Sequence, residues 1–541
     1  MTIANSGWSG ETGQGASSGP GAICRHKPFH NRKAWLATMA FHIFFLMLIV
    51  VNVVRTLRHP MWRDEMGTFQ IATASASLWE LLSKLQYTTH PGLWYSLVWL
   101  ATRFMSDPTS MAIMHIVITI AVWTVIFRWS PFETVEKCLL LLSYFLFWEY
   151  FVISRNYALL ALIGFAFVAL QQHRPQQNVI PWLLLGLLAN THVLGAIWSI
   201  ALGSTLVIKR GRLTPRFVTG AAIYLVLLAF SVKTAAPAPD FGPWATDVRF
   251  DTARFGQALL FPLGAFAPIN PAWLADAVSF VAHAGAAPVP HFWNPNPFQD
   301  FIAATQADVQ HPVRLTLALI APVALCWMIV RAPLPAFGFA IFYVGVLLFS
   351  NIWNFPGYSR HHGIVFLAFV ASVWAARAER PSTRSSIFAF RALLLISALG
   401  GVLTLTSELI PFSQGRNVAE WLRMNGRSDA FLIGSRDAQV STVAGYLGRH
   451  MYFLECECPG TYVVYNSQKQ WLLSPPERAR RLLRAMDSPE RSDAIVILNV
   501  PFRPEETSLV TPTLSILLLK EFVGAETDES YWIYQVKKKS S

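Results

Sequence analysis

The stretch WLATMAFHIFFLMLIVVNVV, residues 35–54, decides the fold class because it is long, apolar and free of Asp, Glu, Lys and Arg. A helix of about 20 such residues spans the hydrocarbon core of a bilayer. A basic cluster between residues 25 and 33 precedes this stretch, and RTLRHPMWRDE follows it at 55–65. Since Lys and Arg collect on the cytoplasmic side of a membrane, we predict a cytoplasmic N-terminus and an uncleaved first span.

The composition of the whole chain extends this prediction. Of 541 residues, 53% are hydrophobic and only 14% are charged, whereas a soluble domain carries about 25% charged residues. The net charge of +12 comes largely from Lys and Arg in segments between apolar runs, which is the pattern of cytoplasmic loops. We therefore expect an integral membrane protein, in contact with membrane lipid and with no nucleic-acid partner.

About eleven apolar runs are predicted to span the membrane, and an odd number of crossings places the C-terminus outside the cytoplasm. The run 179–208 is either one long tilted helix or a short hairpin, and basic residues on both of its flanks favour the hairpin. The predicted spans are 35–54, 111–128, 136–152, 156–171, 179–190, 193–208, 216–232, 312–331, 334–350, 363–377 and 388–410.

The segments outside these spans differ in character. Residues 1–34 are rich in Gly and Ser and are expected to form a disordered cytoplasmic tail. Residues 55–110 and 233–311 are predicted to be two outer loops of a membrane domain that covers 35–410. In the first loop, two apolar segments are too short to cross the bilayer and suit helices in the plane of the interface. They are residues 78–86 and 92–105.

The composition changes again after residue 410, where charged residues return. DAFLIGS (429–435) and DAIVILNV (493–500) are expected to be buried strands. RNVAEWLRMNG (416–426) and PERARRLLRAM (476–486) have the apolar spacing of amphipathic helices. Residues 411–541 are therefore predicted to form a small extracytoplasmic α/β domain.

The adjacent carboxylates Asp64 and Glu65, just beyond the first span, are the leading candidates for catalysis. An acid at a membrane edge is costly to place there unless it is solvated or functional. An Asp carboxylate can take the proton of an acceptor hydroxyl or amine while that atom attacks a sugar C1. The alternative is a solvated loop carboxylate beside Arg63.

A histidine and an arginine follow at outer span ends. His90 precedes Pro91, which is expected to begin a helix and so to place the imidazole near the interface. Arg155, two residues before Tyr157, is predicted to lie on the outer side, where an isolated Arg needs an anion. A lipid phosphate is the natural anion for a guanidinium, and an ion pair with Glu149 is the alternative.

Two more outer positions carry the same residue types. His192 lies at the turn of the predicted hairpin, and Arg360 with His361 precedes a late span. Adjacent histidines are not a metal motif by themselves, and no Cys or His spacing resembles a structural zinc site. No cofactor is assigned, and a divalent metal would have no recognisable ligand motif. Cys456 and Cys458 are either free or joined in a local disulfide.

All of these residues are predicted to lie on the outer side of the membrane, and together they suit the transfer of a group from a phosphate. An acid that activates an acceptor and cations that hold a phosphate leaving group converge on the outer face. The chain has no Walker motif and no Gly-rich nucleotide loop. Since nucleotide sugars are absent outside the cytoplasm, a lipid-phosphate sugar donor is expected.

In the order and spacing of these motifs, the chain resembles the GT-C superfamily of membrane glycosyltransferases, over residues 35–410. The resemblance is to the branch that includes the protein O-mannosyltransferases and the lipid A aminoarabinose transferase. The chain departs from the usual pattern at Gly92 and Asn156, where Pro is usual, and at His361, where an aromatic is common. The matching segments are Asp64-Glu65, His90-Pro91-Gly92-Leu93-Trp94-Tyr95, Arg155-Asn156-Tyr157-Ala158-Leu159, Thr191-His192 and Arg360-His361.

The resemblance implies a GT-C fold with about eleven transmembrane helices and an extracytoplasmic active site in the bacterial inner membrane. It also implies an inverting hexosyl or pentosyl transfer from a polyprenyl-phosphate donor to a lipid, glycan or protein acceptor. Asp64 is then the expected base, and Glu65 is expected to support it or to orient the acceptor. The residues expected to bind the donor phosphate and sugar are His90, Arg155, Tyr157, His192, Arg360 and His361.

Two other functions fit the same charges. A transporter or flippase of lipid-linked saccharides would use the outer residues as a binding site, without cleaving a bond. Transporters often have internal repeats and polar residues in mid-membrane, whereas here no repeat is evident and the polar residues lie at span ends. A non-catalytic assembly subunit is the other alternative, and only the pair Asp64-Glu65 argues against it.

Overall fold

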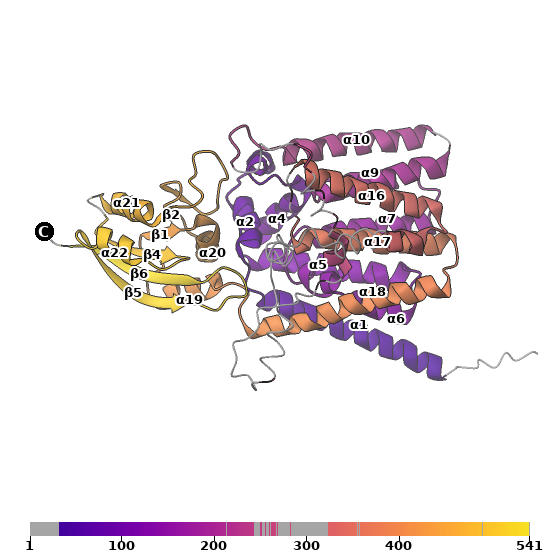
Figure 1. Cartoon of the computed structure of the whole chain (residues 1–541), viewed down its shortest axis with the longest axis horizontal. Coiled ribbons are helices and arrows are strands. Elements are labelled where there is room, and N and C mark those ends of the chain that lie inside the picture. Colours follow the sequence, from indigo (N-terminus) through magenta and orange to yellow (C-terminus); the bar gives the residue numbers. More distant parts are fainter. Residues whose placement is uncertain are drawn as a thin grey trace, which may run out of the picture. The chain divides into compact units, whose positions relative to one another are not determined.

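The computed structural model describes residues 32–211, 214–242, 249–251, 323–353, 357–488 and 491–539, with a few separate residues at 255, 259, 261–266, 268, 282 and 355. Most of the predicted tail and of the second outer loop, and the first part of the predicted span 312–331, lie outside these residues. The chain divides into two units, residues 1–48 and 49–541. Within the second unit, a bundle of helices is joined to a domain built on a β-sheet (Figure 1).

Seven helices in the described part of the chain are long and apolar enough to cross a membrane. Two shorter apolar helices, α7 (Tyr157–His173) and α8 (Ile180–Ala189), pack against members of this set. The polytopic helical architecture expected from the sequence is confirmed, whereas a count of eleven spans is not. The seven helices are α1 (Arg32–Arg58), α5 (Thr109–Trp129), α9 (Val193–Arg210), α10 (Pro215–Ala235), α16 (Pro333–Ile352), α17 (Ser359–Glu379) and α18 (Arg384–Leu403), which continues into the turn η3 (Thr404–Leu409).

The run 179–208 forms the short hairpin that its basic flanks favoured, with α8 and α9 as its two arms. Polar residues of the turn between them form hydrogen bonds at the end of α8 and at the start of α9. Asn190 Nδ2 donates to the carbonyl oxygens of Gly186 and Leu227, both at 2.8 Å. His192 Nδ1 accepts a hydrogen bond from the Leu194 amide at 3.1 Å, which caps α9. The turn therefore fixes the position of His192.

The prediction of one continuous span at 136–152 is wrong. Helix α6 (Thr134–Leu141) ends early, and the chain continues through a π-helical turn, η2 (Phe145–Glu149). Helix α18 approaches the chain closely at this break, because a Cβ atom added at Gly401 would lie 2.0 Å from the Leu142 carbonyl oxygen. Residues 143–160 are nevertheless buried throughout, which is why the segment is as apolar as a true span.

The first outer loop folds into short helices. The segments predicted to be helices, 78–86 and 92–105, form α3 (Leu78–Lys84) with the turn η1 (Leu85–Tyr87), and α4 (Gly92–Phe104). A further helix, α2 (Arg63–Thr73), precedes them and was not predicted. Helix α2 packs against α4 on one side and against α20 (Asp437–Leu447) of the sheet domain on the other. It therefore joins the helix bundle to the C-terminal domain.

Residues beyond 410 form the predicted α/β domain, and the four elements expected from sequence patterns are present. The sheet has six strands in the order β3-β2-β1-β4-β6-β5, with β1 parallel to both β2 and β4 and the remaining pairs antiparallel. The strands are β1 (Leu432–Ser435), β2 (Met451–Phe453), β3 (Cys458–Gly460), β4 (Asp493–Leu498), β5 (Leu514–Phe522) and β6 (Tyr531–Lys538).

Each face of this sheet is covered by helices, because its central strands are apolar on both sides. Helices α19 (Gly415–Met424) and α20 bury Val418 and Val443 against one face. Helices α21 (Pro475–Met486) and α22 (Pro504–Val510) bury Leu482 and Val510 against the other.

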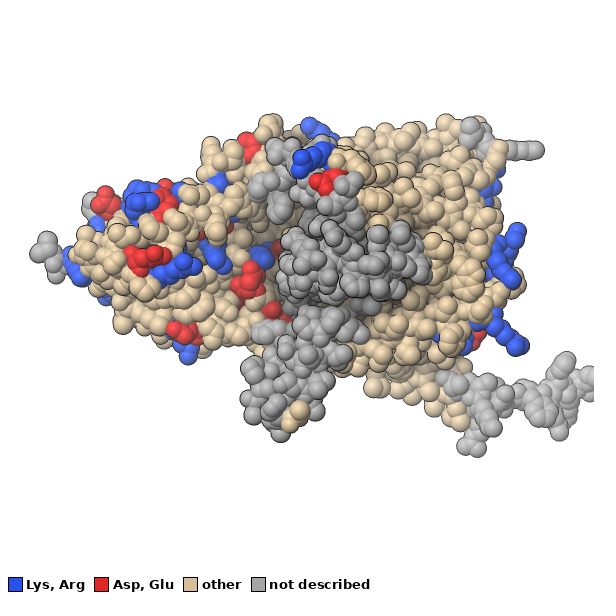
Figure 2. Space-filling model, in the orientation of Figure 1, with Lys and Arg blue, Asp and Glu red and all other residues tan. Residues whose placement is uncertain are grey.

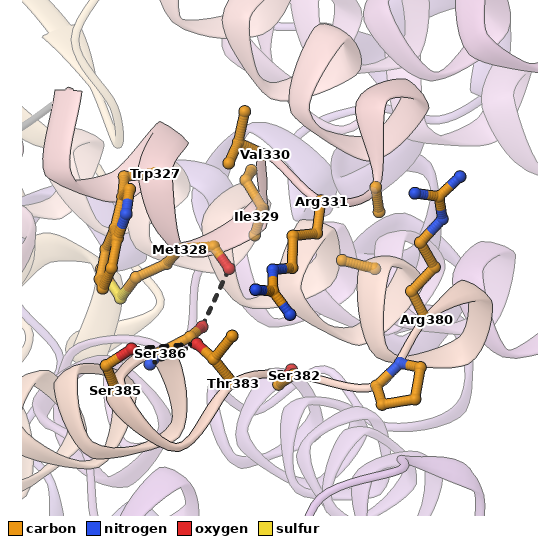
Figure 3. Close-up of a pocket in the computed structure, with 13 residues that line it drawn as sticks. Trp327, Met328, Ile329, Val330, Arg331, Arg380, Ser382, Thr383, Ser385 and Ser386 are labelled. Atoms are coloured by element: carbon orange, nitrogen blue, oxygen red, sulfur yellow. Dashed lines mark hydrogen bonds between the residues drawn. The ribbon is translucent and has the colours of Figure 1, made fainter.

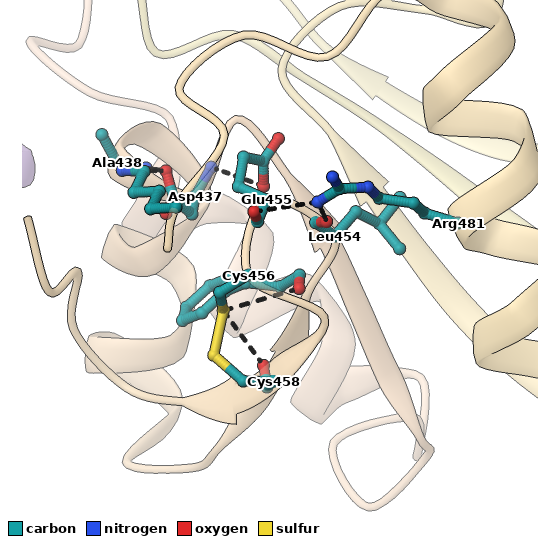
Figure 4. Close-up of a disulfide and its surroundings, with 9 residues drawn as sticks. Asp437, Ala438, Leu454, Glu455, Cys456, Cys458 and Arg481 are labelled. Carbon is teal, nitrogen blue, oxygen red and sulfur yellow. Dashed lines mark hydrogen bonds and ion pairs between the residues drawn. A yellow bond between two sulfur atoms is a disulfide. The ribbon is translucent and has the colours of Figure 1, made fainter. Parts of the chain in front are cut away.

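Cys456 and Cys458 are joined in a disulfide that closes the turn between β2 and β3 (Figure 4). The alternative of two free thiols at these positions is therefore excluded. Arg481 of α21 donates to the carbonyl oxygens of Leu454 and Glu455 in the same turn, at 2.8 and 2.9 Å. The turn is thus fixed both covalently and to the neighbouring helix.

Charged residues are distributed unevenly over the second unit. Figure 2 shows them spread over the C-terminal domain and gathered at the far end of the helix bundle, with few on the helices between. A belt with few charged residues, bounded by charged ends, is the pattern that a bilayer requires. The face therefore agrees with the membrane assignment.

Candidate functional site

Asp64, the second residue of α2, lies between two arginines from distant parts of the chain. Its Oδ2 atom is 2.8 Å from Arg155 Nη1 and 3.1 Å from Arg360 Nη2. Arg155 follows the π-helical turn, and Arg360 is the second residue of α17. The Asp64 side chain is 24% exposed. The carboxylate is therefore held by two cations and is still partly accessible.

The ion pairs of Arg63 and Arg155 differ from the alternatives that the sequence left open for these charges. Arg63 forms ion pairs with Asp528 and Glu529 of the C-terminal domain, so it is not the main partner of Asp64. Arg155 pairs with Asp64, and no ion pair between Arg155 and Glu149 is formed among the described residues.

The arginines decide the protonation state of Asp64. Burial alone would raise its pKa, but the positive charges of Arg155, Arg360 and Arg63 lower that pKa below its ordinary value. In turn, burial tends to lower the pKa of Arg155, and the Asp64 charge more than offsets this. At neutral pH the site therefore holds one carboxylate and two guanidinium groups, with one net positive charge to offer an anion.

Glu65 is fully buried and has different partners from those of Asp64. Its carboxylate accepts from the Ser154 amide at 2.5 Å, the Trp62 amide at 3.3 Å and His59 Nε2 at 2.9 Å. Ser154 immediately precedes Arg155, so Glu65 ties the start of α2 to the segment that carries this arginine. The geometry favours the supporting role expected for Glu65 over contact with an acceptor.

Replacing Glu65 by Gln should destabilise the protein. A neutral amide cannot accept both backbone N–H groups as strongly as a carboxylate, and losing such charge-assisted bonds costs roughly 1.5–3 kcal/mol. Thermal unfolding of the detergent-solubilised protein measures the effect. Glu80→Gln is the control, because Glu80 lies in the same loop, has a side chain that is 41% exposed and makes only local contacts, with Lys84 and the Ala76 amide. Equal melting temperatures for the two variants would contradict the structural role of Glu65.

Three histidines form a cluster beside the arginines. The ring centroids of His192 and His361 are 5.4 Å apart, and those of His90 and His192 are 6.2 Å apart. Tyr157 joins them, with its ring 5.5 Å from His192 and 6.2 Å from His361. The sequence-predicted residues from the first loop, α7, the hairpin turn and α17 therefore meet in one place.

Hydrogen bonds define what the histidines can offer a ligand. Nδ1 of His192 and Nδ1 of His361 accept from backbone amides, of Leu194 at 3.1 Å and Tyr358 at 2.9 Å. Each neutral ring then carries its proton on Nε2 and can donate it. His90 Nδ1 instead lies 2.5 Å from the Thr88 carbonyl oxygen, so its Nε2 is an acceptor. Burial, followed by the Arg155 charge, lowers the pKa of His90 to about 4, so this ring is neutral.

Aromatic residues that were not predicted to belong to the site lie around Arg360 and Tyr157. The Arg360 guanidinium lies over the rings of Tyr358, at 4.5 Å from the centroid, and Trp62, at 5.7 Å. The Tyr150 hydroxyl donates to the Arg360 carbonyl oxygen, and its ring stacks on Tyr157 at 4.8 Å. No local pattern marks Tyr150 or Trp62, because both look like ordinary aromatic residues of a membrane edge.

The described residues contain no cluster of three or more His, Cys, Asp and Glu that could hold a metal ion. Two cavities among them lie away from Asp64. One, of about 160 Å³, is lined by Trp327, Arg331 and Thr383 (Figure 3). The other, of about 350 Å³, lies between α7, α9, α16 and α17. Neither is lined by Asp64, Arg155 or Arg360, so the ion-paired cluster remains the candidate site on chemical grounds.

No protein-family model matches the chain, and no curated protein matches it by sequence. Among solved structures, the chain is similar to ArnT from Cupriavidus metallidurans in the apo state, with 13% identity over 93% of this chain and 98% of that chain and a TM-score of 0.48. ArnT bound to undecaprenyl phosphate is similar over the same shares, with 13% identity and a TM-score of 0.46.

Proposed function

We propose that the protein is an inverting glycosyltransferase that moves a sugar from a polyprenyl-phosphate donor to an acceptor at the outer face of the membrane. One observation carries the proposal. Asp64 is paired with both Arg155 and Arg360, at 2.8 and 3.1 Å, and its side chain is 24% exposed. The cluster thus combines a base with an anion site, which are the two groups that displacement of a phosphate-linked sugar needs.

In the proposed reaction, the Asp64 carboxylate takes the proton of an acceptor hydroxyl or amine as that atom forms a bond to C1 of the sugar. The bond between C1 and the phosphate oxygen breaks, and the oxygen keeps the bonding pair. Arg155 and Arg360 stabilise the charge that this leaves on the phosphate. Since the acceptor attacks opposite the leaving group, the configuration at C1 is inverted.

The arginines would also control the strength of the base. Without a donor they hold the Asp64 carboxylate and lower its pKa, which makes it a poor proton acceptor. A donor phosphate bound by the same guanidinium groups would share their charge and weaken their hold on Asp64. Its pKa would then rise towards the ordinary range, so that the base becomes effective once the donor is in place.

His90, Tyr157, His192 and His361 are proposed to bind the donor around this centre. The Nε2 hydrogens of His192 and His361 can reach phosphate or sugar oxygens, whereas Nε2 of His90 can accept from a sugar hydroxyl. All three rings are buried or partly buried and lie within one contact network. Glu65 is proposed to position Asp64 and Arg155 rather than to touch substrate.

Bond cleavage separates this proposal from a transporter of lipid-linked saccharides. Proteoliposomes of the purified protein are supplied with undecaprenyl phosphate carrying a radiolabelled hexose or pentose, together with a detergent extract of source membranes that lack this protein. The proposal predicts free undecaprenyl phosphate and label in the acceptor fraction. Label that crosses the bilayer on an intact lipid, with no cleavage for any sugar, would support the transporter instead.

A further inference from the structure

The loop between β5 and β6 is bonded to the chain that enters the C-terminal domain. The Glu526 amide donates to the Pro411 carbonyl oxygen at 2.9 Å, and the Thr527 amide donates to the Phe412 carbonyl oxygen at 3.1 Å. Both acceptors belong to the connection that follows η3, the turn that continues α18. The loop therefore runs beside the covalent link between the membrane domain and the C-terminal domain.

The same loop is bonded to the start of α2, the helix that carries Asp64. The Arg63 amide donates to Glu529 Oε1 at 2.7 Å. The Arg63 guanidinium is ion-paired with Asp528 and lies 3.9 Å from Glu529 Oε1. An amide in the first turn of a helix has no acceptor within that helix, and the helix dipole favours a carboxylate there. Glu529 thus supplies, from the C-terminal domain, the acceptor for the residue directly before Asp64.

The Glu529 side chain is fixed by its own neighbours. It is fully buried, and its Oε2 atom accepts from the Ser413 hydroxyl at 2.6 Å. The Tyr531 hydroxyl lies 3.3 Å from the same oxygen. A buried carboxylate is costly unless hydrogen bonds satisfy it, and here both of its oxygens are bonded. Since Ser413 belongs to the connection and Tyr531 to β6, this carboxylate joins the connection, the sheet and α2.

The connection itself packs on the residues around Glu65. The ring centroid of Phe412 lies 4.8 Å from that of His59 and 5.9 Å from that of Trp62. The Glu65 carboxylate is bonded to the His59 ring and to the Trp62 amide. The first turn of α2 is therefore held on two sides, by Glu65 and by the C-terminal domain.

We propose that Glu529 is a positioning residue, through which the C-terminal domain holds Asp64 in place for catalysis. Its carboxylate fixes the Arg63 amide, and so the first turn of α2, relative to the two arginines of the site. A carboxylate accepts from an amide more strongly than a neutral carboxyl does, and only the carboxylate attracts the Arg63 guanidinium. Protonation of Glu529 should therefore loosen the start of α2. This inference rests on the proposed glycosyl transfer, and it makes that reaction depend on the C-terminal domain and on pH.

The protonation state of Glu529 changes near neutral pH. Burial raises its pKa to about 7, although the charge and the amide of Arg63 act against this rise. The charged or titratable groups that face it are Arg63 of α2, Asp528 of the same loop and Tyr531 of β6. Above about pH 7 the side chain is a carboxylate, and below this pH it becomes neutral. Transfer should therefore decrease as the pH falls through about 7, whereas the pKa of Asp64 lies below its ordinary value.

The test compares Glu529→Gln with the wild type over a range of pH, in the transfer assay described above. Gln keeps the shape of the side chain and removes its charge. Since a misplacement of about 1 Å can lower a rate roughly a hundredfold, the maximal rate at about pH 8 should fall roughly ten- to a hundredfold. The decrease of transfer near pH 7 should disappear, because the group that titrates there is gone.

Glu506→Gln is the matched control, because Glu506 has the same kind of role at another helix. It is fully buried, accepts from the Arg503 amide at the start of α22 at 2.8 Å, and pairs with Arg478. This variant should lose stability at most. It should keep the wild-type rate per folded molecule and the decrease of transfer near pH 7.

Arg63→Met is a second variant, which keeps the backbone amide bonded to Glu529. It removes a positive charge that lowers the pKa of Glu529. That pKa should then rise, so the decrease of transfer should move to higher pH. If Glu529→Gln does not fold, the pH profile of Arg63→Met decides by itself.

An unchanged rate and pH profile in Glu529→Gln would overturn the positioning role while leaving glycosyl transfer intact. A lower rate at every pH, with the decrease near pH 7 retained, would make Glu529 merely structural. A decrease that stays at the wild-type pH in Arg63→Met would also contradict the inference. Absence of any transfer by the wild type would instead overturn the proposed function, and this inference with it.

Discussion

Replacing Asp64 by Asn should lower the rate of sugar transfer by roughly 10²- to 10⁴-fold, which is the usual contribution of a positioned general base. Asn keeps the shape of the side chain but cannot take the acceptor proton. Steady-state transfer from the radiolabelled undecaprenyl-phosphate donor measures the loss.

The same variant separates catalysis from donor binding. Once Asp64 is neutral, Arg155 and Arg360 no longer have its charge as a partner, so undecaprenyl phosphate should bind at least as tightly as to the wild type. Asp107→Asn is the matched control, because Asp107 lies in the same loop and its carboxylate accepts from the Thr109 amide at the start of α5. Near-normal transfer by Asp64→Asn in a folded protein would place the base elsewhere.

Replacing Arg155 by Ala should weaken the binding of undecaprenyl phosphate about ten- to a hundredfold. The expected loss is that of a charge-assisted hydrogen bond, roughly 1.5–3 kcal/mol. Arg155→Lys should restore only part of the affinity, because an ammonium group cannot form the planar fork with phosphate oxygens. Titration of the solubilised variants with undecaprenyl phosphate measures the change.

Thermal unfolding, measured beside the titration, excludes a purely structural explanation. Arg155→Ala leaves Asp64 with Arg360 as its remaining close ion-pair partner, so some loss of stability accompanies the loss of affinity. Arg103→Ala is the control, because Arg103 lies in the same outer region and packs on Trp99, at 5.1 Å from its centroid. A variant of Arg155 that melts early but titrates normally would remove this residue from the site.

The membrane architecture and the residue types of the site could be predicted from the sequence, because both follow from local patterns. Runs of about 20 apolar residues identify membrane helices with little ambiguity. Asp64, Arg155 and Arg360 stand out because charges at a membrane edge are costly without a partner. Their meeting in one ion-paired cluster could not be predicted from spacing, since they lie in three segments separated by most of the membrane domain.

Features that depend on tertiary contacts were missed or wrongly predicted. The break in 136–152 lies where Gly401 of α18, more than 240 residues away along the chain, packs closely on Leu142. Helix α2 has no clear helical pattern in its sequence. Its start is stabilised by the hydrogen bond from the Trp62 amide to Glu65, and Gln70 bonds it to Ser441 of the C-terminal domain. The bridge between Phe241 and Asn466 has no local signal either, because it joins two segments that are distant along the chain.

The stereochemistry of transfer tests the central claim most directly. Direct displacement by an acceptor that Asp64 deprotonates, with the phosphate held by Arg155 and Arg360, has one bond-forming step at C1. Nuclear magnetic resonance of the glycosylated acceptor, compared with the undecaprenyl-phosphate donor, determines the anomeric configuration before and after transfer. The account predicts complete inversion, with one free undecaprenyl phosphate formed per sugar transferred. A product with retained configuration would require a covalent glycosyl intermediate and would contradict the account.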